Sequence, residues 1–437
     1  MLFQHMRGGK RVESLLRRLA RYLSRGAAIA GLLLCCLWVT SYLVRSPSTG
    51  LRVPDANDGR AGAGAAALSE PLVSTTTTTT GDTARRQVAD DAVTFALVVI
   101  NHGSVPFFLN WVCHYRCVLQ SQFLAGTVRL PVTVRARATD GKVLDWLRQR
   151  SLDTPWLRIR AARAPLARAV ASYQAMKASN SLFYEIERQK FSAVHAMFAR
   201  KTHLPSRFYL LVCDVDVVFL HEPVRAILRY GDADLYMQCD GCNTELYGAQ
   251  QVQCPYEYNT GFMLFAVDQR TRSGRLRFQA IRQLIAEVVH ESIKTERARQ
   301  LQPERKSVHD QFIFNKVLKK WTHNHMVQLR SPYENMTSIA GIEYVRPRIM
   351  YLPYEVFPNG CVLFGYRHRE PSPAVRALLE RGLVVAVHAN YRNGASEKWR
   401  ALRSVNLTIA STQEESLNAQ LCPPCDEIQA TASTGHM

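Results

Sequence analysis

The feature that most constrains this chain is an apolar run that ends in two aspartates, residues 208–220, with the sequence FYLLVCDVDVVFL. Its first five residues are aromatic or branched and show no polar alternation, which predicts a strand buried on both faces, as in a parallel sheet. Asp214 and Asp216 follow, separated only by Val215. In extended backbone, residues two apart point to the same side, so we expect both carboxylates on one face.

The two carboxylates predict a metal site. Like charges on one face of a buried strand repel each other unless a cation lies between them. The expected cation is hard, Mn²⁺ or Mg²⁺, because such ions take oxygen ligands and keep positions open for phosphate. For an isolated pair, a solvated strand end with two aspartates that bind nothing is the favoured alternative, and features further along the chain reverse that balance. Asp214-Val215-Asp216 is therefore our candidate metal and diphosphate site.

The amino-terminal region predicts a membrane anchor. Residues 7–25 hold seven Lys or Arg and a single acid, Glu13, and residues 27–44 then run without a charge. Eighteen apolar or small residues suffice to span a bilayer, and the positive side predicts that the amino end is cytoplasmic. We therefore expect a cytoplasmic tail (residues 1–26), a signal-anchor helix (residues 27–44) and a lumenal remainder, as in a single-pass type II protein. A cleaved signal peptide is the alternative.

Residues 45–90 predict an extended stem. They are rich in Gly, Ala, Ser and Thr, include six consecutive threonines at positions 75–80, and hold almost no large apolar residues. Such a segment cannot bury a core and stays extended. The threonine run fits O-linked sugars and an undecorated spacer equally well.

The charge balance narrows the class of ligand. The chain has a net charge of +19, and about +12 remains outside the amino-terminal segment. That surplus fits anionic ligands such as nucleotide sugars or acidic glycans, and it fits plain solubility equally well. No zinc finger, RNA-binding signature or basic tract with interleaved aromatics occurs, so we do not expect nucleic acid as a partner.

A folded α/β domain is expected over residues 91–410, because strand-like runs alternate with helical periodicity. The predicted strands are residues 93–100, 130–135, 208–212, 233–238, 258–267, 348–353 and 383–387. The predicted helices are residues 107–119, 142–149, 161–200, 224–230, 275–294 and 312–321. Residues 357–364 read as a further β segment, and residues 411–437 read as a C-terminal tail.

Polar residues follow several of these elements. Asn259-Thr260-Gly261 is expected to form a polar turn at the mouth of a strand. Asp310-Gln311 opens an amphipathic helix, where the pair can cap the helix or face a pocket. His388 follows the last strand, with Gly394 and Lys398 in what we expect to be the same loop. A lone histidine in this place is ordinarily a satisfied turn residue, and the neighbouring glycine and lysine weigh against that reading.

Lys190 stands in the long helical segment before the central strand. It can project toward an anionic ligand. Its spacing favours an ordinary solvated helix lysine instead, so the sequence alone does not assign it to a site.

Taken in order, these segments resemble the nucleotide-diphospho-sugar transferase domain of glycosyltransferase family 77 and, more distantly, family 8 enzymes of the same GT-A fold. The likeness covers roughly residues 93–405. Its motifs are Asp214-Val215-Asp216 with Glu222-Pro223, Asn259-Thr260-Gly261-Phe262, Asp310-Gln311 with Phe314-Asn315, Phe357-Pro358-Asn359-Gly360, and His388-Ala389-Asn390-Tyr391 with Gly394 and Lys398. No single motif is specific, but five in this order are. The loop 239–254 carries three cysteines and departs from the family pattern, which puts the acceptor in question.

The resemblance implies a Rossmann-like, mostly parallel sheet with flanking helices and a glycosyltransferase activity. The enzyme would move a sugar from a nucleoside-diphosphate donor, UDP-linked, to a glycan or glycoprotein acceptor, with Mn²⁺ or Mg²⁺ as cofactor. Together with the predicted topology, it implies a Golgi membrane protein whose catalytic domain is lumenal. Two other classes stay open: a non-catalytic GT-A-like glycan-binding membrane protein, and a metal-dependent phosphohydrolase.

The resemblance also implies roles for individual residues. Asp216 would ligate the ion, Asp214 would ligate it or hold the ribose, and His388 would complete the set with an imidazole nitrogen, which prefers Mn²⁺. The donor-binding residues would be Asp214, Asn259, Gly261, Gly394 and Lys398. Enzymes of these families retain the anomeric configuration. Asp310 and Gln311 would then be the catalytic pair, with Asp310 holding sugar hydroxyls and Gln311 lying under the anomeric carbon during attack from the front face.

Nine cysteines lie outside the predicted membrane span, and in an oxidising lumen several should pair. We expect Cys213, in the central strand, to stay free, and Cys113 or Cys117 to pair with a distant partner. Two pairs, Cys239/Cys242 and Cys422/Cys425, have zinc-like spacing, but the distance between them favours disulfides over a zinc site. Two N-glycosylation sequons begin at Asn335 and Asn406.

Overall fold

The computed structural model describes residues 92–127, 130–150, 152–164, 181–200, 204–242, 257–301, 309–330, 346–365, 371–391, 394–410 and 422–428. These residues all belong to the second of two compact units, Thr76–Met437, and the first unit is Met1–Thr75. The predicted anchor, the stem and Asn335 lie outside the described residues. Within the described ranges, no helix combines the length and apolar character that a membrane span requires.

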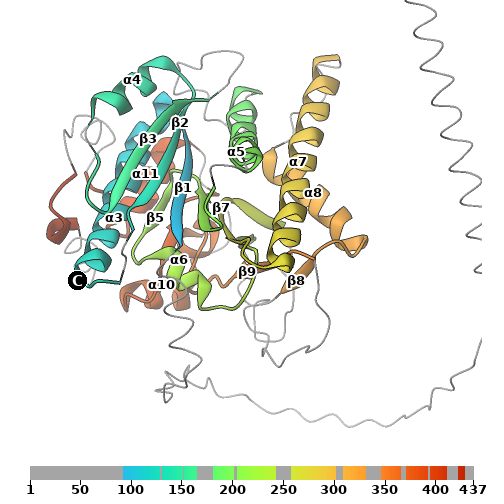
Figure 1. Ribbon diagram of the computed structural model, residues 1–437. Coiled ribbons are helices and arrows are strands. Elements are labelled where there is room, and N and C mark those ends of the chain that lie inside the picture. Colours follow the sequence, from blue (N-terminus) through green and yellow to red (C-terminus); the bar gives the residue numbers. More distant parts are fainter. Residues whose placement is uncertain are drawn as a thin grey trace, which may run out of the picture. The chain divides into compact units, whose positions relative to one another are not determined.

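An eight-stranded sheet forms the centre of the domain, in the order β3-β2-β1-β4-β7-β6-β9-β8 (Figure 1). Its strands are β1 (Val93–Ile100), β2 (Val132–Ala138), β3 (Leu157–Arg163), β4 (Arg207–Cys213), β6 (Leu235–Asp240), β7 (Glu257–Asp268), β8 (Gln328–Arg330) and β9 (Arg348–Leu352). β7 runs antiparallel to its neighbours β4 and β6, and every other adjacent pair is parallel. The predicted α/β class with a mostly parallel sheet is confirmed.

A second sheet consists of two short antiparallel strands, β5 (Val217–Phe219) and β10 (Ala386–His388). β5 follows the central strand β4 almost at once, whereas β10 comes from near the end of the described chain. Their pairing places His388 opposite Val217. Two segments that are far apart in the sequence therefore meet directly after the two aspartates.

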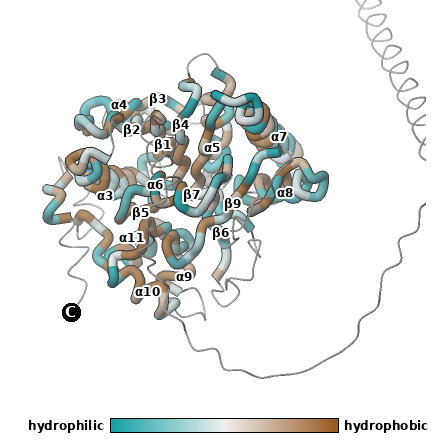
Figure 2. The backbone as a smooth tube through the Cα atoms, turned by 60° about the horizontal axis from the view of Figure 1, so that its bottom comes forward, coloured by the Kyte–Doolittle hydropathy of each residue, from teal (hydrophilic) through white to brown (hydrophobic). Residues whose placement is uncertain are grey.

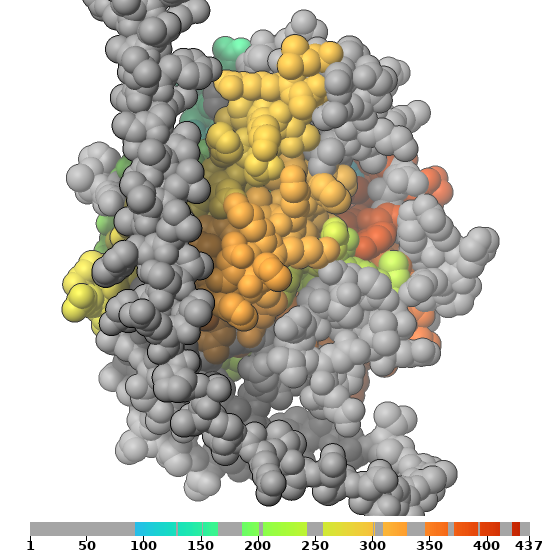
Figure 3. All heavy atoms as spheres, turned by 90° about the vertical axis from the view of Figure 1, so that its right-hand side faces the viewer, coloured from blue at the N-terminus to red at the C-terminus, as the bar shows by residue number. Residues whose placement is uncertain are grey.

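Helices cover both faces of the large sheet (Figure 1). They are α3 (Val105–Leu124), α4 (Gly141–Gln149), α5 (Ser181–Ala199), α6 (Pro223–Leu228), α7 (Arg272–Leu301), α8 (Asp310–His323), α9 (Gly360–Phe364), α10 (Pro373–Glu380) and α11 (Ala395–Arg403), with a 3-10 turn at His102–Ser104. α3 and α4 lie on one face, and α5, α7 and α8 lie on the other. Figure 3 shows α7 and α8 side by side on the outer surface of the domain.

Aromatic side chains join the sheet to the α5–α7 layer. The ring of Phe198 on α5 contacts Phe265 of β7 at 5.4 Å and Phe278 of α7 at 5.2 Å between centroids. Phe208 of β4 also meets Phe278 edge-on, at 5.9 Å. Edge-to-face pairs of this kind add to the free energy gained by burying the rings. The central strands are accordingly the most hydrophobic part of the backbone in Figure 2, whereas the outer helices mix polar and apolar positions.

Side-chain caps fix where several helices begin. Asp140 precedes α4, and its carboxylate accepts a hydrogen bond from the Val143 amide at 2.9 Å. Glu222 precedes α6, where Pro223 is the first helical residue, and its carboxylate accepts hydrogen bonds from two amides of the first turn. Such caps satisfy amide groups that the helix itself leaves unpaired. The helix predicted to start at Glu222-Pro223 is thereby confirmed.

Two predicted elements are wrong. Residues 157–163 form strand β3, so the helix expected over residues 161–200 does not begin before the gap in the description, and its described part is α5. The charged residues of β3 hid the strand from the prediction, because β3 lies at the edge of the sheet, where charged side chains are tolerated. Residues 360–364 form helix α9 instead of a β segment, since the side chain of Asn359 caps its first turn through the Val362 amide at 3.0 Å.

Between described residues, three disulfides join distant parts of the domain. Cys113–Cys422 and Cys117–Cys425 attach the C-terminal segment 422–428 to α3, beyond the boundary expected at residue 410. Cys242 pairs with Cys361. The predicted zinc alternative is therefore wrong for these cysteines, because their thiols are used in disulfides. The prediction that Cys213 is free is confirmed, and its side chain is buried.

Candidate metal and donor site

The two aspartates lie in a tight turn directly after β4. The amide of Asp214 donates to the Gly261 carbonyl of β7 at 2.8 Å, and the Val217 amide donates back to the Asp214 carbonyl at 3.3 Å. This bond between residues three apart closes a β-turn, so the expected extended backbone is wrong at this point. The cause is that pairing with β7 ends at Cys213, opposite Phe262. Both carboxylates nevertheless face the same space.

His388 reaches the aspartates because β10 pairs with β5. The Ala389 amide donates to the Asp216 carbonyl at 3.0 Å, which holds the end of β10 against the turn. The Nε2 atom of His388 lies 3.5 Å from Oδ1 of Asp216 and 3.8 Å from Oδ2 of Asp214. One ligand atom from each of the three residues lies within 4.8 Å of the others. The structure thus brings together the three residues that the sequence analysis assigns to a metal.

Each aspartate uses its other oxygen to bind a lysine. Lys190, on α5, lies 2.8 Å from Oδ1 of Asp214 and also donates to the Thr260 carbonyl at 3.1 Å. Lys398 lies 2.6 Å from Oδ2 of Asp216. The oxygens left over are the two that face His388. Lys190 is only 5% exposed, so the reading of it as a solvated helix lysine is wrong.

Lys398 belongs to a helix, whereas the sequence analysis expects it in a loop. It lies in the second turn of α11, and its amide donates to the Gly394 carbonyl at 3.3 Å. Gly394 is the N-cap residue, with a φ of 84° that glycine adopts without strain. A Cβ at this glycine would meet nothing within 4 Å. Gly394 therefore sets the start of α11, and the helix carries the lysine to Asp216.

A glutamine fixes the orientation of the His388 ring. The Nε2 amide of Gln238 donates to the Phe357 carbonyl at 2.8 Å, so its Oε1 atom must be the acceptor for His388 Nδ1 at 2.9 Å. In the neutral imidazole, Nδ1 then carries the hydrogen and Nε2 keeps its lone pair. A metal-binding histidine is commonly held in this way, by a hydrogen bond from its distal nitrogen. The ring thus presents Nε2, the ligand atom, to the two aspartates.

Gly261 leaves the room that the site needs. A Cβ at this position would lie 2.3 Å from Cε1 of His388, 2.6 Å from Oδ2 of Asp214 and 2.9 Å from Nε2 of His388. These are the atoms that line the space between the three candidate ligands. Residue 261 is part of β7, in a bulge where the pairing with β6 shifts register, so the polar turn expected here is wrong. Only a residue without a side chain allows the three groups to converge.

The electrostatics of the cluster keep its charges in place. Burial alone would raise the pKa of Asp216, but the charge of Lys398 and its hydrogen bond hold that pKa well below its ordinary value. Burial would lower the pKa of Lys398, and Asp216 raises it above its ordinary value. Burial has the same effect on the pKa of Lys190, which Asp214 and Asp310 raise. Asp216 is therefore ionised and both lysines are charged at neutral pH.

The three residues fit a hard divalent cation. Two carboxylate oxygens and one neutral imidazole nitrogen suit Mn²⁺ and Mg²⁺, and the nitrogen favours Mn²⁺. The space that a Cβ at Gly261 would fill lies between these atoms. Three protein ligands leave coordination positions for phosphate oxygens and water. This arrangement can hold a metal ion together with a diphosphate.

Asp310 and Gln311 lie next to the candidate ligands, at the start of α8. Oδ2 of Asp310 is 3.3 Å from Nζ of Lys190, which also binds Asp214, so the lysine bridges the two aspartates. Oδ1 of Asp310 accepts hydrogen bonds from the Gln311 amide at 2.7 Å and from the Thr260 hydroxyl at 3.3 Å. Oδ1 is thus hydrogen-bonded by protein groups, whereas Oδ2 makes no hydrogen bond among the described residues and is paired only with the charge of Lys190.

Asp240, at the end of β6, links three segments around the site. Its Oδ2 atom accepts a hydrogen bond from the side-chain amide of Gln311 at 2.7 Å. Its Oδ1 atom accepts from the amides of Asn259 at 3.2 Å and Asn390 at 3.5 Å. The amide of Gln311 is thereby oriented, and among the described residues its Oε1 atom accepts no hydrogen bond. The Oδ1 atom of Asn259 also accepts a hydrogen bond from the Gly261 amide at 2.7 Å, which stabilises the bulge in β7.

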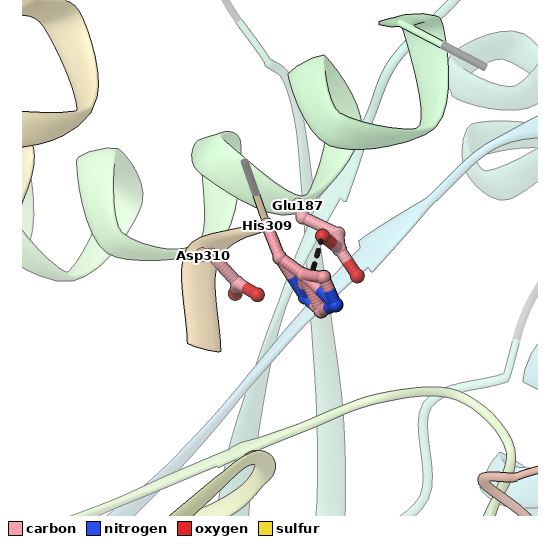
Figure 4. Close-up of side chains that lie close together, drawn as sticks. All are labelled: Glu187, His309 and Asp310. Carbon is pink, nitrogen blue, oxygen red and sulfur yellow. Dashed lines mark ion pairs between the residues drawn. The ribbon is translucent and has the colours of Figure 1, made fainter. Parts of the chain in front are cut away.

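A second group of possible ligands consists of Glu187, His309 and Asp310 (Figure 4). Oε2 of Glu187, on α5, lies 3.6 Å from Nδ1 of His309, which directly precedes α8. Burial, and then the charge of Asp310, raise the pKa of Glu187 well above its ordinary value, so this carboxyl favours its protonated form. Asp310 already has Lys190 as its cation. We therefore place the metal at the first group and not at this one.

Sequence reasoning missed Gln238 and Asp240, which hold the predicted residues in place. The available signal was the position of Gln238 in the buried strand LYMQCD, because a buried amide must find hydrogen-bond partners. Asp240 belongs to the cysteine-bearing loop that was set aside as unusual. Gln238 lies 150 residues from His388, and Asp240 lies 71 residues from Gln311, so local pattern does not reveal these contacts.

Comparison with known families gives one match. The sequence model of the family described as nucleotide-diphospho-sugar transferase matches residues 151–402, more than half of the chain. This range begins between α4 and β3 and ends in α11, so it contains all the candidate site residues. No curated protein matches the chain in sequence.

Several solved structures of glycosyltransferases are similar to the chain. GlyE of Streptococcus pneumoniae TIGR4 matches with a TM-score of 0.38 and 11% identity, covering 78% of this chain and 63% of GlyE. The galactosyltransferase LgtC, in complex with donor and acceptor sugar analogues, matches with a TM-score of 0.36 and 11% identity, covering 77% of this chain and 99% of LgtC. Mouse xyloside xylosyltransferase 1 matches with a TM-score of 0.35 and 10% identity, covering 68% of this chain and 98% of the mouse enzyme. The chain thus spans less than two thirds of GlyE, and at these scores the family match alone carries the assignment.

Proposed function

Because the chain belongs to the nucleotide-diphospho-sugar transferase family and is thus a glycosyltransferase, we propose that it transfers a sugar from a UDP-linked donor to a glycan or glycoprotein acceptor. The transfer depends on Mn²⁺ or Mg²⁺ held by Asp214, Asp216 and His388. The observation that carries this proposal is the convergence of one ligand atom from each of these residues around the space left by Gly261. Membership of family 77 in particular is part of the proposal.

The charged residues bind the diphosphate of the donor. A bound divalent ion supplies Lewis-acid stabilisation for the charge that develops on the leaving diphosphate. Asp214 and Asp216 each contribute the oxygen that the lysines leave unused. Lys398 binds the other oxygen of Asp216, next to the candidate metal site, where it can bond the diphosphate once the donor is present. Asn259, Gly261 and Gly394 complete the donor site, with Gly261 allowing close approach of the backbone.

The sugar lies toward Asp310 and Gln311, and the transfer retains its configuration. Retention requires either a protein nucleophile or attack from the face that the diphosphate leaves. Asp310 is a poor nucleophile because Lys190 and Thr260 already bind its oxygens, and we assign it to holding sugar hydroxyls. Gln311 places its amide carbonyl under the anomeric carbon, in an orientation set by Asp240. Front-face attack by the acceptor follows from these roles.

The anomeric configuration of the first product tests the stereochemical part. Proton NMR during turnover of an α-linked UDP-sugar should show an α-linked product. A β-anomeric coupling from the same donor would contradict front-face attack and the roles of Asp310 and Gln311. It would leave the metal site itself untouched, because inverting enzymes can use the same ion.

The proposed location is the Golgi membrane, with residues 27–44 as a single type II anchor and the catalytic domain in the lumen. The sequon at Asn406 supports this, because the residue is exposed and follows α11. A glycosidase-sensitive mass that disappears in Asn406→Gln would place this residue in the secretory lumen. A full-length protein that carries no glycan at Asn406 and that a protease reaches from the cytoplasmic side of intact vesicles would contradict the topology.

Release of UDP from a panel of UDP-sugars, with purified full-length protein, tests the central proposal. A chelator should abolish release and added Mn²⁺ should restore it. Asp216→Asn should lose activity while staying folded, because the substitution keeps the size of this buried side chain. Asp145→Asn is the matched control, since this aspartate is exposed on α4 and far from the site.

The same assay separates the alternative classes. A metal-dependent phosphohydrolase would release inorganic phosphate, and a glycan-binding protein would turn over no donor. Full activity in the presence of the chelator, or in Asp216→Asn, would overturn the assigned metal site.

A further inference from the structure

Four arginines gather on one face of the β2–β3 strand pair. Arg135 and Arg137 alternate on β2 with fully buried Val and Ala residues, which face α4 on the other side of the sheet. Arg158 and Arg160 project to the same side as the β2 arginines, because the register pairs Arg160 with Arg135. We call these four residues the arginine face. It lies on the side of the sheet that carries α5.

The arginine face has almost no compensating acid. Among the described residues, its one ion pair joins Arg160 to Asp153 at 3.7 Å, and both side chains are largely exposed, so the pair contributes little. The sequence contains no Asp or Glu from residue 154 to residue 184, so this part of the chain can supply no acid to the arginine face. The face therefore carries a net charge close to that of its four guanidinium groups.

Two of these guanidinium groups are half-buried, and their Nε atoms lack a hydrogen-bond partner in the part of the chain that the structure describes. The Nε atoms of Arg135 and Arg137 are buried and make no hydrogen bond among the described residues. Arg135 also rests on the ring of Phe95, 5.0 Å from its centroid. Burial, followed by repulsion from Arg137 and Arg200, lowers the pKa of Arg135. A half-buried cation that lacks an acceptor is unfavourable on its own, so the arrangement suits an anion that is not part of the described chain.

We propose that the arginine face binds an anionic glycan, a chain of sugars that carries sulfate, phosphate or carboxylate groups. Guanidinium groups bind such oxyanions through paired hydrogen bonds. Their spacing follows from the sheet, about 7 Å between alternate residues of one strand and about 5 Å between strands. This grid fits charges that repeat along a narrow chain.

The position of the face connects it to transfer. β2 and β3 run parallel to β1 and β4, so their carboxyl ends lie at the edge of the sheet where Asp214 follows β4. Ligands of open parallel sheets bind at this edge. A glycan laid along the strands therefore extends toward the donor site and acts as a tethered acceptor. The choice of a glycan over other anionic polymers rests on the proposed function.

Binding of fluorescently labelled polysaccharides to the full-length protein tests the proposal. The probes are heparin for sulfate, polygalacturonate for carboxylate, a phosphate-bearing polysaccharide, and neutral dextran as the uncharged control. The double variant Arg158→Glu/Arg160→Glu changes two exposed members of the face. We expect it to weaken binding of at least one anionic probe about tenfold or more, since each charge-assisted contact contributes severalfold to affinity.

The matched control is Arg376→Glu/Arg381→Glu, which makes the same charge change at exposed positions on and just after α10. It should leave binding within about twofold of the wild type, whereas purely non-specific attraction, which depends on net charge alone, would fall equally in both double variants. If the charge reversal on β3 prevents folding, Arg158→Gln/Arg160→Gln removes the charge without adding an acid. Circular dichroism establishes that each variant is folded.

Three results would overturn the proposal: equal loss of affinity in the two double variants, no loss in either, or dextran binding as strong as that of the anionic probes. Loss of binding to phosphatidylserine vesicles with unchanged glycan binding would assign the face to a membrane surface instead. Binding is measured without donor or metal, so the outcome does not depend on turnover. A protein that binds the anionic probes and releases no UDP would contradict the proposed function and leave this inference standing.

Discussion

Replacing Gly261 with alanine is the sharpest test of the site, because it adds one carbon where the candidate ligands meet. The new Cβ would lie 2.3 Å from Cε1 of His388 and 2.6 Å from Oδ2 of Asp214. Ordinary contact begins at 3.4 Å, so the imidazole must move by about 1 Å and the carboxylate by nearly as much. The φ of Gly261 lies outside the left-handed region, so alanine meets no backbone strain and the effect reports crowding alone.

The size of the effect follows from that displacement. Ligand distances in a metal site tolerate about 0.2 Å, and a shift of about 1 Å in a catalytic group lowers activity roughly 100-fold. We expect Gly261→Ala to weaken Mn²⁺ binding by at least about 100-fold and to abolish most transfer. The free energy of unfolding should fall by roughly 1–3 kcal/mol, the usual consequence of adding a carbon to a packed position.

Calorimetric titration of Mn²⁺ into the full-length protein, with and without UDP, measures the first quantity, and thermal unfolding measures the second. Gly141→Ala is the control, because a Cβ at that glycine meets nothing within 4 Å and its φ is also ordinary. The control should bind Mn²⁺ like the wild type. A folded Gly261→Ala protein that binds Mn²⁺ within about threefold of the wild type would refute the placement of the metal between Asp214, Asp216 and His388.

Three further predictions concern other residues of the domain. Gln238→Leu removes the acceptor that holds His388 Nδ1, so Mn²⁺ affinity measured by calorimetry should fall about 10- to 100-fold. Gln238→Glu keeps an acceptor, so its Mn²⁺ affinity should stay closer to that of the wild type. Equal losses in the two variants would contradict the role of the hydrogen bond. Lys398→Ala should weaken UDP binding and lower the rate of transfer, with little change in Mn²⁺ affinity. His388→Ala should weaken the binding of both UDP and Mn²⁺. Unchanged UDP affinity in the two variants would remove both residues from the donor site. Burial lowers the pKa of His114 from 6.5 to about 4. As the pH falls, His114 therefore takes up a proton in the unfolded chain before it does so in the folded protein. The contribution to stability that is present above about pH 6.5 is then lost as the pH falls toward 4. The loss is about 3 kcal/mol, and urea unfolding at pH 7 and pH 4.5 should show a smaller difference in His114→Gln than in the wild type.

The sheet was largely predictable from the sequence, because its buried strands are uninterrupted apolar runs. Residues 93–100 are found as predicted, and the strand after Tyr258 differs by a residue at each end. β3 was missed because its arginines face outward on a strand at the edge of the sheet, where charge is tolerated. α9 was missed because a single side chain, Asn359, decides that residues 360–364 form a helix.

The candidate ligands were predictable, and their supports were not. Asp214, Asp216 and His388 each carry chemistry that a pattern can name, and they lie close together in the structure. Their geometry depends on long-range pairing, since β10 meets β5 only after about 170 residues of chain have folded. The turn at Asp214 and the roles of Gln238 and Asp240 follow from contacts across that distance. Local periodicity contains no information about such contacts.

The disulfides of α3 impose an order on biosynthesis. Cys113 and Cys117 leave the ribosome early, and their partners Cys422 and Cys425 follow more than 300 residues later. At about 5–20 residues per second, the two thiols wait roughly 15–60 s for their partners. During that interval Cys213, Cys239 and Cys242 are made, and each is an available wrong partner. Correct pairing therefore depends on α3 burying its thiols early or on an isomerase that undoes mistakes, and cells that lack an oxidising secretory compartment should yield protein with the wrong cross-links or none.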